Sequence, residues 1–85
     1  MQAVVLVDAA PGFEDGVEAA LRQFHGVLRV TRLKDRNYDM AVLLDVEDAA
    51  AVTKFMTNQV RLVTGVSGIE RVERPSPELL RRLTA

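Results

Sequence analysis

The sequence contains no cysteine, no tryptophan and only one histidine. Without cysteine the chain can form neither a disulfide scaffold nor a thiolate metal site, and it offers no thiol nucleophile. A single imidazole also argues against a metal centre built on histidines. We therefore expect no metal ion and no cofactor.

The sequence also lacks an excess of charge of either sign. Eleven Lys and Arg stand against twelve Asp and Glu, a formal net charge of −1. Direct DNA binding normally needs a basic surface, so this balance argues against it. No apolar run approaches the roughly 20 residues that span a bilayer, and the N-terminus lacks a signal-peptide pattern. We expect a cytoplasmic protein that does not contact membranes.

The 85 residues predict a single domain, residues 1–85, of which 75–85 form a C-terminal helical extension. Short β-branched apolar runs predict strands, and apolar residues at helical spacing predict helices between them. The predicted strands cover residues 2–7, 27–33, 38–46 and 66–73. The predicted helices cover residues 13–24, 49–63 and 77–83.

This order predicts an α+β, ferredoxin-like βαββαβ fold: a four-stranded antiparallel sheet with two helices on one face, plus a short C-terminal helix. The first strand is apolar on both faces, because Ala3, Val5 and Val7 alternate with Val4 and Leu6. A sheet covered on one face only should alternate apolar and polar residues. We expect the terminal helix to be too short to cover the second face, and to dock on its own domain or a neighbour. The pattern therefore predicts a homodimer in which a second sheet covers that face, a dimeric α+β-barrel type of assembly.

The polar segment KDRNYDM, residues 34–40, separates the second and third predicted strands. Asp39 could accept hydrogen bonds from an α-ammonium group, with Tyr38 as a flat wall and Arg36 as a bidentate partner for a carboxylate. The alternative is structural. In that case Asp39 holds the turn through backbone N–H groups, and Tyr38 packs at a dimer edge.

Four short motifs occur in order along the chain. They are AxPGFEDxVxxxLxxxxGV at residues 9–27, Tyr-Asp at 38–39, Val-Glu-Asp at 46–48 and VTGV at 63–66. Together, over residues 3–73, they resemble the effector-binding domain of the Lrp/AsnC regulators. The resemblance implies a stand-alone ligand-binding and oligomerisation domain without the helix-turn-helix. It also implies an amino acid or related metabolite as effector, homodimers that build higher oligomers, and a regulatory role, including transcription regulation through a partner.

The ligand-binding residues that the resemblance implies come from the polar segment and the last strand, and none is catalytic. They are Arg36, Asn37, Tyr38, Asp39 and Arg71. Arg36 stands where the family usually has a glycine, and Arg71 where it tends to have a hydroxyl residue. These two guanidinium groups would change the charge and volume of the pocket.

Two other classes of protein use similar chains. A small cofactor-free enzyme of the dimeric α+β-barrel kind, a monooxygenase or isomerase, would need a closed cavity lined by residues such as His25, Tyr38 or Asp39. An ACT-like regulatory module would fit Gly12 at the first strand-helix turn, and its sheets would associate side by side. Gly16 lies inside the first predicted helix, where it costs about 1 kcal/mol relative to alanine, so we expect another backbone to approach it closely.

Overall fold

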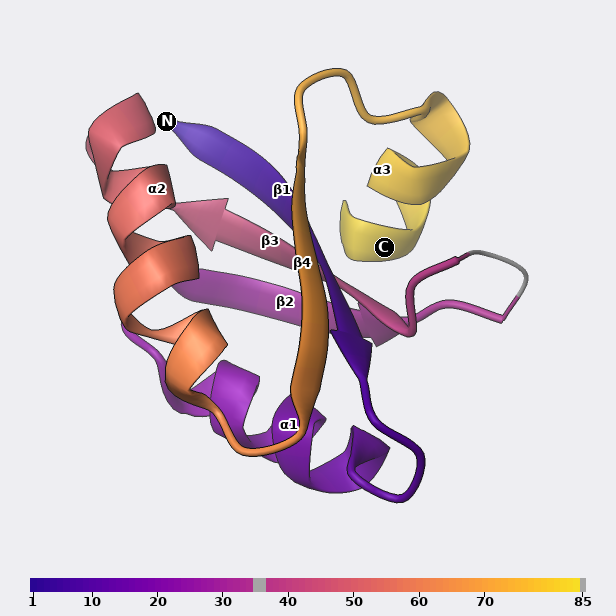
Figure 1. Cartoon of the computed structure of the whole chain (residues 1–85). Coiled ribbons are helices and arrows are strands. Elements are labelled where there is room, and N and C mark those ends of the chain that lie inside the picture. The colour runs from indigo at the N-terminus through magenta and orange to yellow at the C-terminus, as the bar shows by residue number, and fades with distance from the viewer. Residues whose placement is uncertain (35–36, 85) are drawn as a thin grey trace.

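The computed structural model describes residues 1–34 and 37–84 (Figure 1). Its strands are β1 (Gln2–Ala9), β2 (Val27–Arg32), β3 (Met40–Asp45) and β4 (Val66–Val72). Its helices are α1 (Glu14–Gln23), α2 (Ala49–Asn58) and α3 (Pro77–Thr84), and a short 3₁₀ turn, η1 (Val60–Leu62), follows α2. The predicted order of elements is confirmed. No helix in this described part of the chain is both long and apolar enough to cross a bilayer.

The four strands form one antiparallel sheet in the order β2-β3-β1-β4. In the register, Val5 lies opposite Val42 on β3 and Arg71 on β4. Directly opposed residues share a face of the sheet, so these pairs identify the side chains on each face. The predicted ferredoxin-like βαββαβ fold is therefore confirmed.

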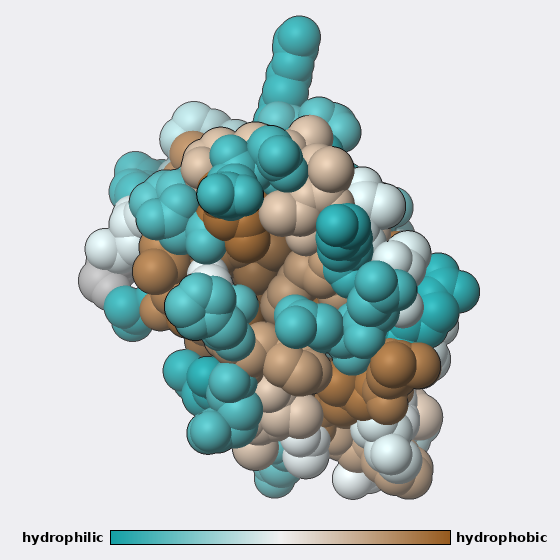
Figure 2. Space-filling model, turned by 90° about the vertical axis from the view of Figure 1, so that its left-hand side faces the viewer, coloured by the Kyte–Doolittle hydropathy of each residue, from teal (hydrophilic) through white to brown (hydrophobic). Residues whose placement is uncertain are grey.

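Helices α1 and α2 cover one face of the sheet and enclose the larger hydrophobic core. Val17 and Leu21, four residues apart on α1, are fully buried against β1 and β3 residues of that face. Phe24 and Phe55 join the two helices edge to face, with ring centroids 5.9 Å apart. Asp48 caps α2, since its Oδ1 accepts the N–H of Ala51 at 2.9 Å. The outer surface on the α2 side carries polar groups around a band of less polar residues (Figure 2).

Helix α3 lies on the other face of the sheet (Figure 1). Leu79 and Leu83 are buried there against Val4, Ala41 and Leu43. The prediction that the terminal helix is too short to cover this face is wrong for its central part. Of the two expected docking sites, α3 uses its own domain. The homodimer stays a prediction.

Two of the five glycines differ clearly in what the fold requires of them. Gly65 has a φ of +94°, and a Cβ at this position would lie 2.4 Å from the Cβ of Phe13. Gly16 lies exposed on α1, and a Cβ there would meet nothing within 4 Å. Within this chain nothing lies close to the position of that Cβ, and the approach of a backbone from another subunit stays a prediction.

Candidate functional site

Asp39 connects the turn before β3 to the end of β1. Its Oδ2 accepts the N–H of Ala9 at 2.8 Å, and its carbonyl oxygen accepts the N–H of Leu33 at 2.8 Å. The two segments meet because β1 and β3 run antiparallel, with Val7 opposite Met40. Strand β3 begins at Met40 rather than at residue 38, because Asp39 is still part of the turn. Asp39 thus bonds a backbone N–H, as in the structural alternative, but on a distant strand.

A second carboxyl group, that of Asp8, lies beside Asp39. The hydrogen bond from Asp8 to Asp39 raises the pKa of Asp8 above its ordinary 3.8, helped by desolvation and the negative charge of Asp39. The same hydrogen bond lowers the pKa of Asp39, and the Ala9 N–H lowers it further. The pair therefore holds a proton on Asp8 more strongly than an isolated aspartate would, and it keeps Asp39 ionised.

The side chain of Tyr38 lies beside Asp8, next to residues of β4. The Tyr38 hydroxyl lies 3.5 Å from Oε1 of Glu70. A Cβ added to Gly68 would lie 3.4 Å from Cε1 of Tyr38 and 3.3 Å from Cβ of Asp8, so glycine leaves room for both side chains. Desolvation, followed by the charge of Glu70, raises the pKa of Tyr38. This phenol therefore stays protonated at neutral pH.

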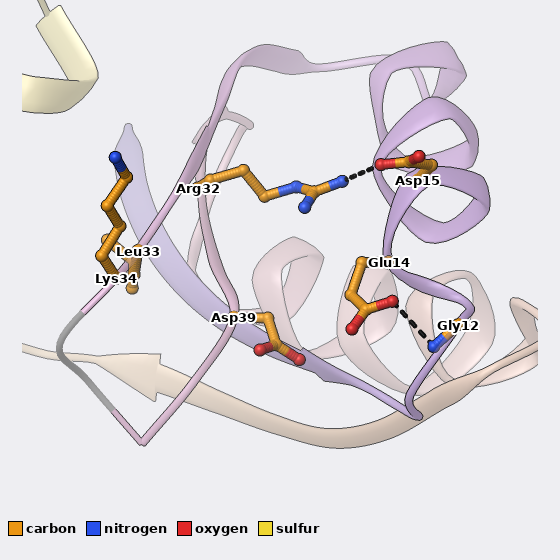
Figure 3. A pocket seen from close by; sticks show the side chains of 7 residues that line it. All are labelled: Gly12, Glu14, Asp15, Arg32, Leu33, Lys34 and Asp39. Carbon is orange, nitrogen blue, oxygen red and sulfur yellow. Dashed lines mark hydrogen bonds and ion pairs between the residues drawn. The ribbon is translucent and has the colours of Figure 1, made fainter.

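On the other side of Asp39, a pocket of about 540 Å³ separates the start of α1 from the end of β2 (Figure 3). Glu14 and Asp39 extend into the space between these segments, whereas Lys34 extends away from both carboxylates. The residues that line the pocket are Gly12, Glu14, Asp15, Arg32, Leu33, Lys34 and Asp39. Acidic and basic groups therefore share one open, polar pocket.

Ion pairs fix one wall of this pocket. Arg32 donates from Nη2 to Asp15 Oδ1 and from Nε to Glu18 Oε1, both at 2.6 Å. Glu18 also accepts from Arg22, and these bonds lower the pKa of Glu18. Glu14 Oε1 accepts the N–H of Gly12 at 2.9 Å. Asp15 and Arg32 thus pair with each other, and the carboxylates of Glu14 and Asp39 face the pocket.

The structure brings the predicted ligand-binding residues together only in part. Tyr38 and Asp39 are neighbours in the turn, and Asn37 is exposed beside them. Arg71 lies opposite Val5, a residue of the helix-side core, whereas Asp8 and Gly68 oppose each other on the α3 side. The Nε of Arg71 is buried without a hydrogen-bond partner, and Glu73 Oε1 lies 3.8 Å away. Arg36 lies outside the described residues.

Five residues around Asp39 were not expected from the sequence. A signal was present for Asp8 alone, because an aspartate ending the first strand and a Tyr-Asp pair opening the third must meet if those strands are antiparallel neighbours. The additional residues are Asp8, Glu14, Asp15, Arg32 and Lys34. Across residues 1–34 and 37–84, no three His, Cys, Asp or Glu side chains converge in a way that could hold a metal ion.

No protein-family model matches the chain, and no curated protein matches it significantly. Several solved structures do. One is the crystal structure of FFRP-DM1, to which the chain is 20% identical. The match covers 84% of this chain and 93% of FFRP-DM1, with a TM-score of 0.76. A protein from Thermus thermophilus is also 20% identical, with coverage of 89% and 96% and a TM-score of 0.77.

A third solved structure is a transcriptional regulator of Neisseria meningitidis in complex with L-methionine. It is 18% identical, with a TM-score of 0.76 over 89% of this chain and 50% of that one. The chain thus spans about half the length of this regulator. At these identities the likeness is one of fold, and this chain has the same α+β fold as FFRP-DM1 and as one half of the methionine-bound regulator.

Proposed function

We propose that the chain is a regulatory domain of the Lrp/AsnC kind, spanning residues 1–85, that binds an amino acid or related metabolite and assembles with further copies. The observation that carries the proposal is the pocket between α1 and β2, in which Glu14 and Asp39 face the same space. Two carboxylates suit the ammonium group of an amino acid, and Lys34 lines the pocket although its side chain extends away from both of them. The pocket thus has charges that suit the ammonium group.

The size of the pocket and the shared fold also support the proposal of a regulatory domain that binds a small molecule. A volume of about 540 Å³ lies within the range of roughly 300–1,000 Å³ of small-molecule sites. The regulator from Neisseria meningitidis, which has this fold, was solved with L-methionine. That regulator acts in transcription, and we extend a regulatory role to this chain through a partner, since its net charge of −1 does not favour direct DNA binding.

The remaining predicted residues have distinct roles in this proposal. Tyr38 and Asn37 would border the ligand, and Arg36 would contact its carboxylate. Arg71 lies on the helix side of β4, away from Asp39. It would therefore reach a ligand only in an assembly, where another copy of the chain presents it.

The enzyme alternative is less well supported. Cofactor-free enzymes of the dimeric α+β-barrel kind work in a closed cavity, whereas the pocket beside Asp39 opens to solvent. The transcriptional regulator among the similar structures also favours regulation over catalysis. The ACT-like alternative differs in the way subunits associate, and side-by-side sheets in an assembly would identify it.

A thermal-shift screen of amino acids, each paired with its keto acid, tests the proposal. We expect at least one amino acid to raise the melting temperature while its keto acid, which lacks the ammonium group, does not. Asp39→Asn should abolish the shift. Glu47→Gln is the matched control, because it removes one exposed carboxylate outside the pocket and should keep the shift. A panel without any shift, or equal shifts for both members of each pair, would count against the proposal.

A further inference from the structure

Helix α3 is attached to the sheet by few contacts. The contacts are the buried side chains of Leu79 and Leu83 and a hydrogen bond from Arg82 Nη2 to the carbonyl oxygen of Arg32, whereas Ser76 Oγ caps the helix itself by accepting the N–H of Leu79 at 3.2 Å. The helix has eight residues, and a helix of this length does not persist alone in water. It therefore stays helical only while it is docked.

The sheet face below α3 is apolar beyond the area that the helix covers. α3 lies mainly over β2 and β3. Towards β1 and β4, a groove of about 170 Å³ remains beside the helix, and its apolar lining includes Val4, Val72, Pro75 and Leu80. Leu6 and Leu33 extend the same apolar cluster. An undocked α3 would thus leave a contiguous apolar face, which soluble monomers rarely expose.

We propose that α3 is a displaceable cover, which competes with the sheet of a second copy for this face. The proposal rests on the assembly part of the proposed function and adds the element that controls it. The cluster at the centre of the face is apolar, and Glu70, opposite Leu6 on the same face, would need a cation of the second copy as its partner.

The charges at the two ends of the face favour a second copy as the occupant. Asp8 lies towards one end of the face, with Glu70 on the neighbouring strand, and Arg74 follows the opposite end of β4. A two-fold axis that reverses the strands would bring the acidic end of one copy towards the basic end of the other. The face is therefore complementary to itself in both polarity and charge.

The cover also adjoins the pocket beside Asp39. Arg82 bonds the carbonyl of Arg32, and Leu33 packs in the cluster with Leu79 and Leu83. Both Arg32 and Leu33 line the pocket. The same short segment of chain therefore forms a wall of the pocket and a support of the cover.

Two substitutions at one exposed position of α3 test the proposal. The N–H of Leu80 donates to the carbonyl of Ser76 at 3.0 Å, and the Leu80 side chain is 39% exposed. Leu80→Pro removes this hydrogen bond and breaks the helix, whereas Leu80→Ser loses the same side chain and keeps the helix. We expect sedimentation equilibrium to give a dimer dissociation constant about tenfold lower, or lower still, for Leu80→Pro than for Leu80→Ser. The double variant Leu79→Ser, Leu83→Ser should shift it in the same direction.

Four outcomes would overturn the proposed role of α3. Equal association by the two Leu80 variants would overturn the role of α3 while leaving assembly itself intact. Weaker association by the double variant would show that α3 is exchanged between copies, which also overturns the proposal. Loss of hydrogen-exchange protection in β1 of Leu80→Pro would mean that the sheet needs α3 to fold, again overturning it. If wild type and variants all remain monomers, both this proposal and the assembly part of the proposed function fail, although ligand binding would stand.

Discussion

The side chain of Phe13 occupies the space that a β-carbon on Gly65 would need, with its own Cβ only 2.4 Å from that position. The contact joins the loop before α1 to the turn before β4, and the N–H of Ala10 donates to the carbonyl of Gly65 at 2.7 Å beside it. Phe13 nevertheless remains 45% exposed. The aromatic ring therefore serves as a clamp between two connections rather than as a core residue.

Replacing Gly65 with alanine should destabilise the fold strongly. The new Cβ would clash with Phe13, and alanine is strained at a φ of +94°. Together we expect a loss of about 2–4 kcal/mol in the free energy of unfolding, measured by urea denaturation. Combining the change with Phe13→Ala should recover part of the loss, because the clash disappears while the backbone strain remains. No recovery would show that the ring is not the obstacle.

Gly16→Ala is expected to have the opposite effect. The position is exposed on α1, and the added methyl group meets nothing within 4 Å. Alanine is the better helix former, so the free energy of unfolding should rise by about 0.5–1 kcal/mol. Destabilisation that grows with protein concentration would instead reveal a contact between subunits at this helix.

Asp39→Ala should cost about 1–2 kcal/mol of stability, because the backbone N–H of Ala9 loses its acceptor at 2.8 Å. Asp39→Asn keeps an acceptor oxygen and should lose clearly less. Chemical denaturation of both variants at neutral pH compares them directly. Equal losses would mean that the charge of Asp39, and not its bond to Ala9, holds the turn.

The Asp8 and Asp39 pair predicts a pH dependence with a defined sign. Because the folded pKa of Asp8 is raised above 3.8, its stabilising contribution is complete below that value and is lost as the pH rises through the raised pKa. The pKa of Asp39 is lowered, so its contribution is present above 3.8 and is lost as the pH falls through the lowered value. Asp8→Asn removes the first titration. The free energy of unfolding of the variant relative to wild type should therefore rise in urea titrations as the pH increases from below 3.8 through the raised pKa of Asp8, and a difference that stays constant with pH would contradict the coupling.

The element order was predictable because local signals and tertiary structure agree. Gly26 and Gly65 both adopt positive φ at the predicted element ends, and Val17 and Leu21 fall at helical spacing on the buried side of α1. The docking of α3 was not predictable, since helix length says nothing about where the connection from β4 directs the chain. The path of this connection places Leu79 and Leu83 on the second face, and that path is set by the tertiary structure and not by the local sequence.

The candidate site was likewise predictable only in part from the sequence. Asp39 was identified from its position at the start of the third predicted strand, but Asp8 and Glu14 come from a segment that only the pairing of β1 with β3 brings near. The face of Arg71 depends on the register of β4, which shifts at an irregularity opposite Asp8 and Ala9. A shift of one residue moves a side chain to the other face, so counting along the strand could not place Arg71.

The position of β1 in the sheet has a consequence during synthesis on the ribosome. β1 is made first, but its hydrogen-bonding partners are residues 40–45 on one edge and 66–72 on the other. Until residue 72 has left the exit tunnel, this apolar strand keeps at least one edge unpaired, a state that invites pairing with other nascent chains. The earliest of the four strands is therefore among the last to complete its pairing, and until then its edge is open to pairing with other chains.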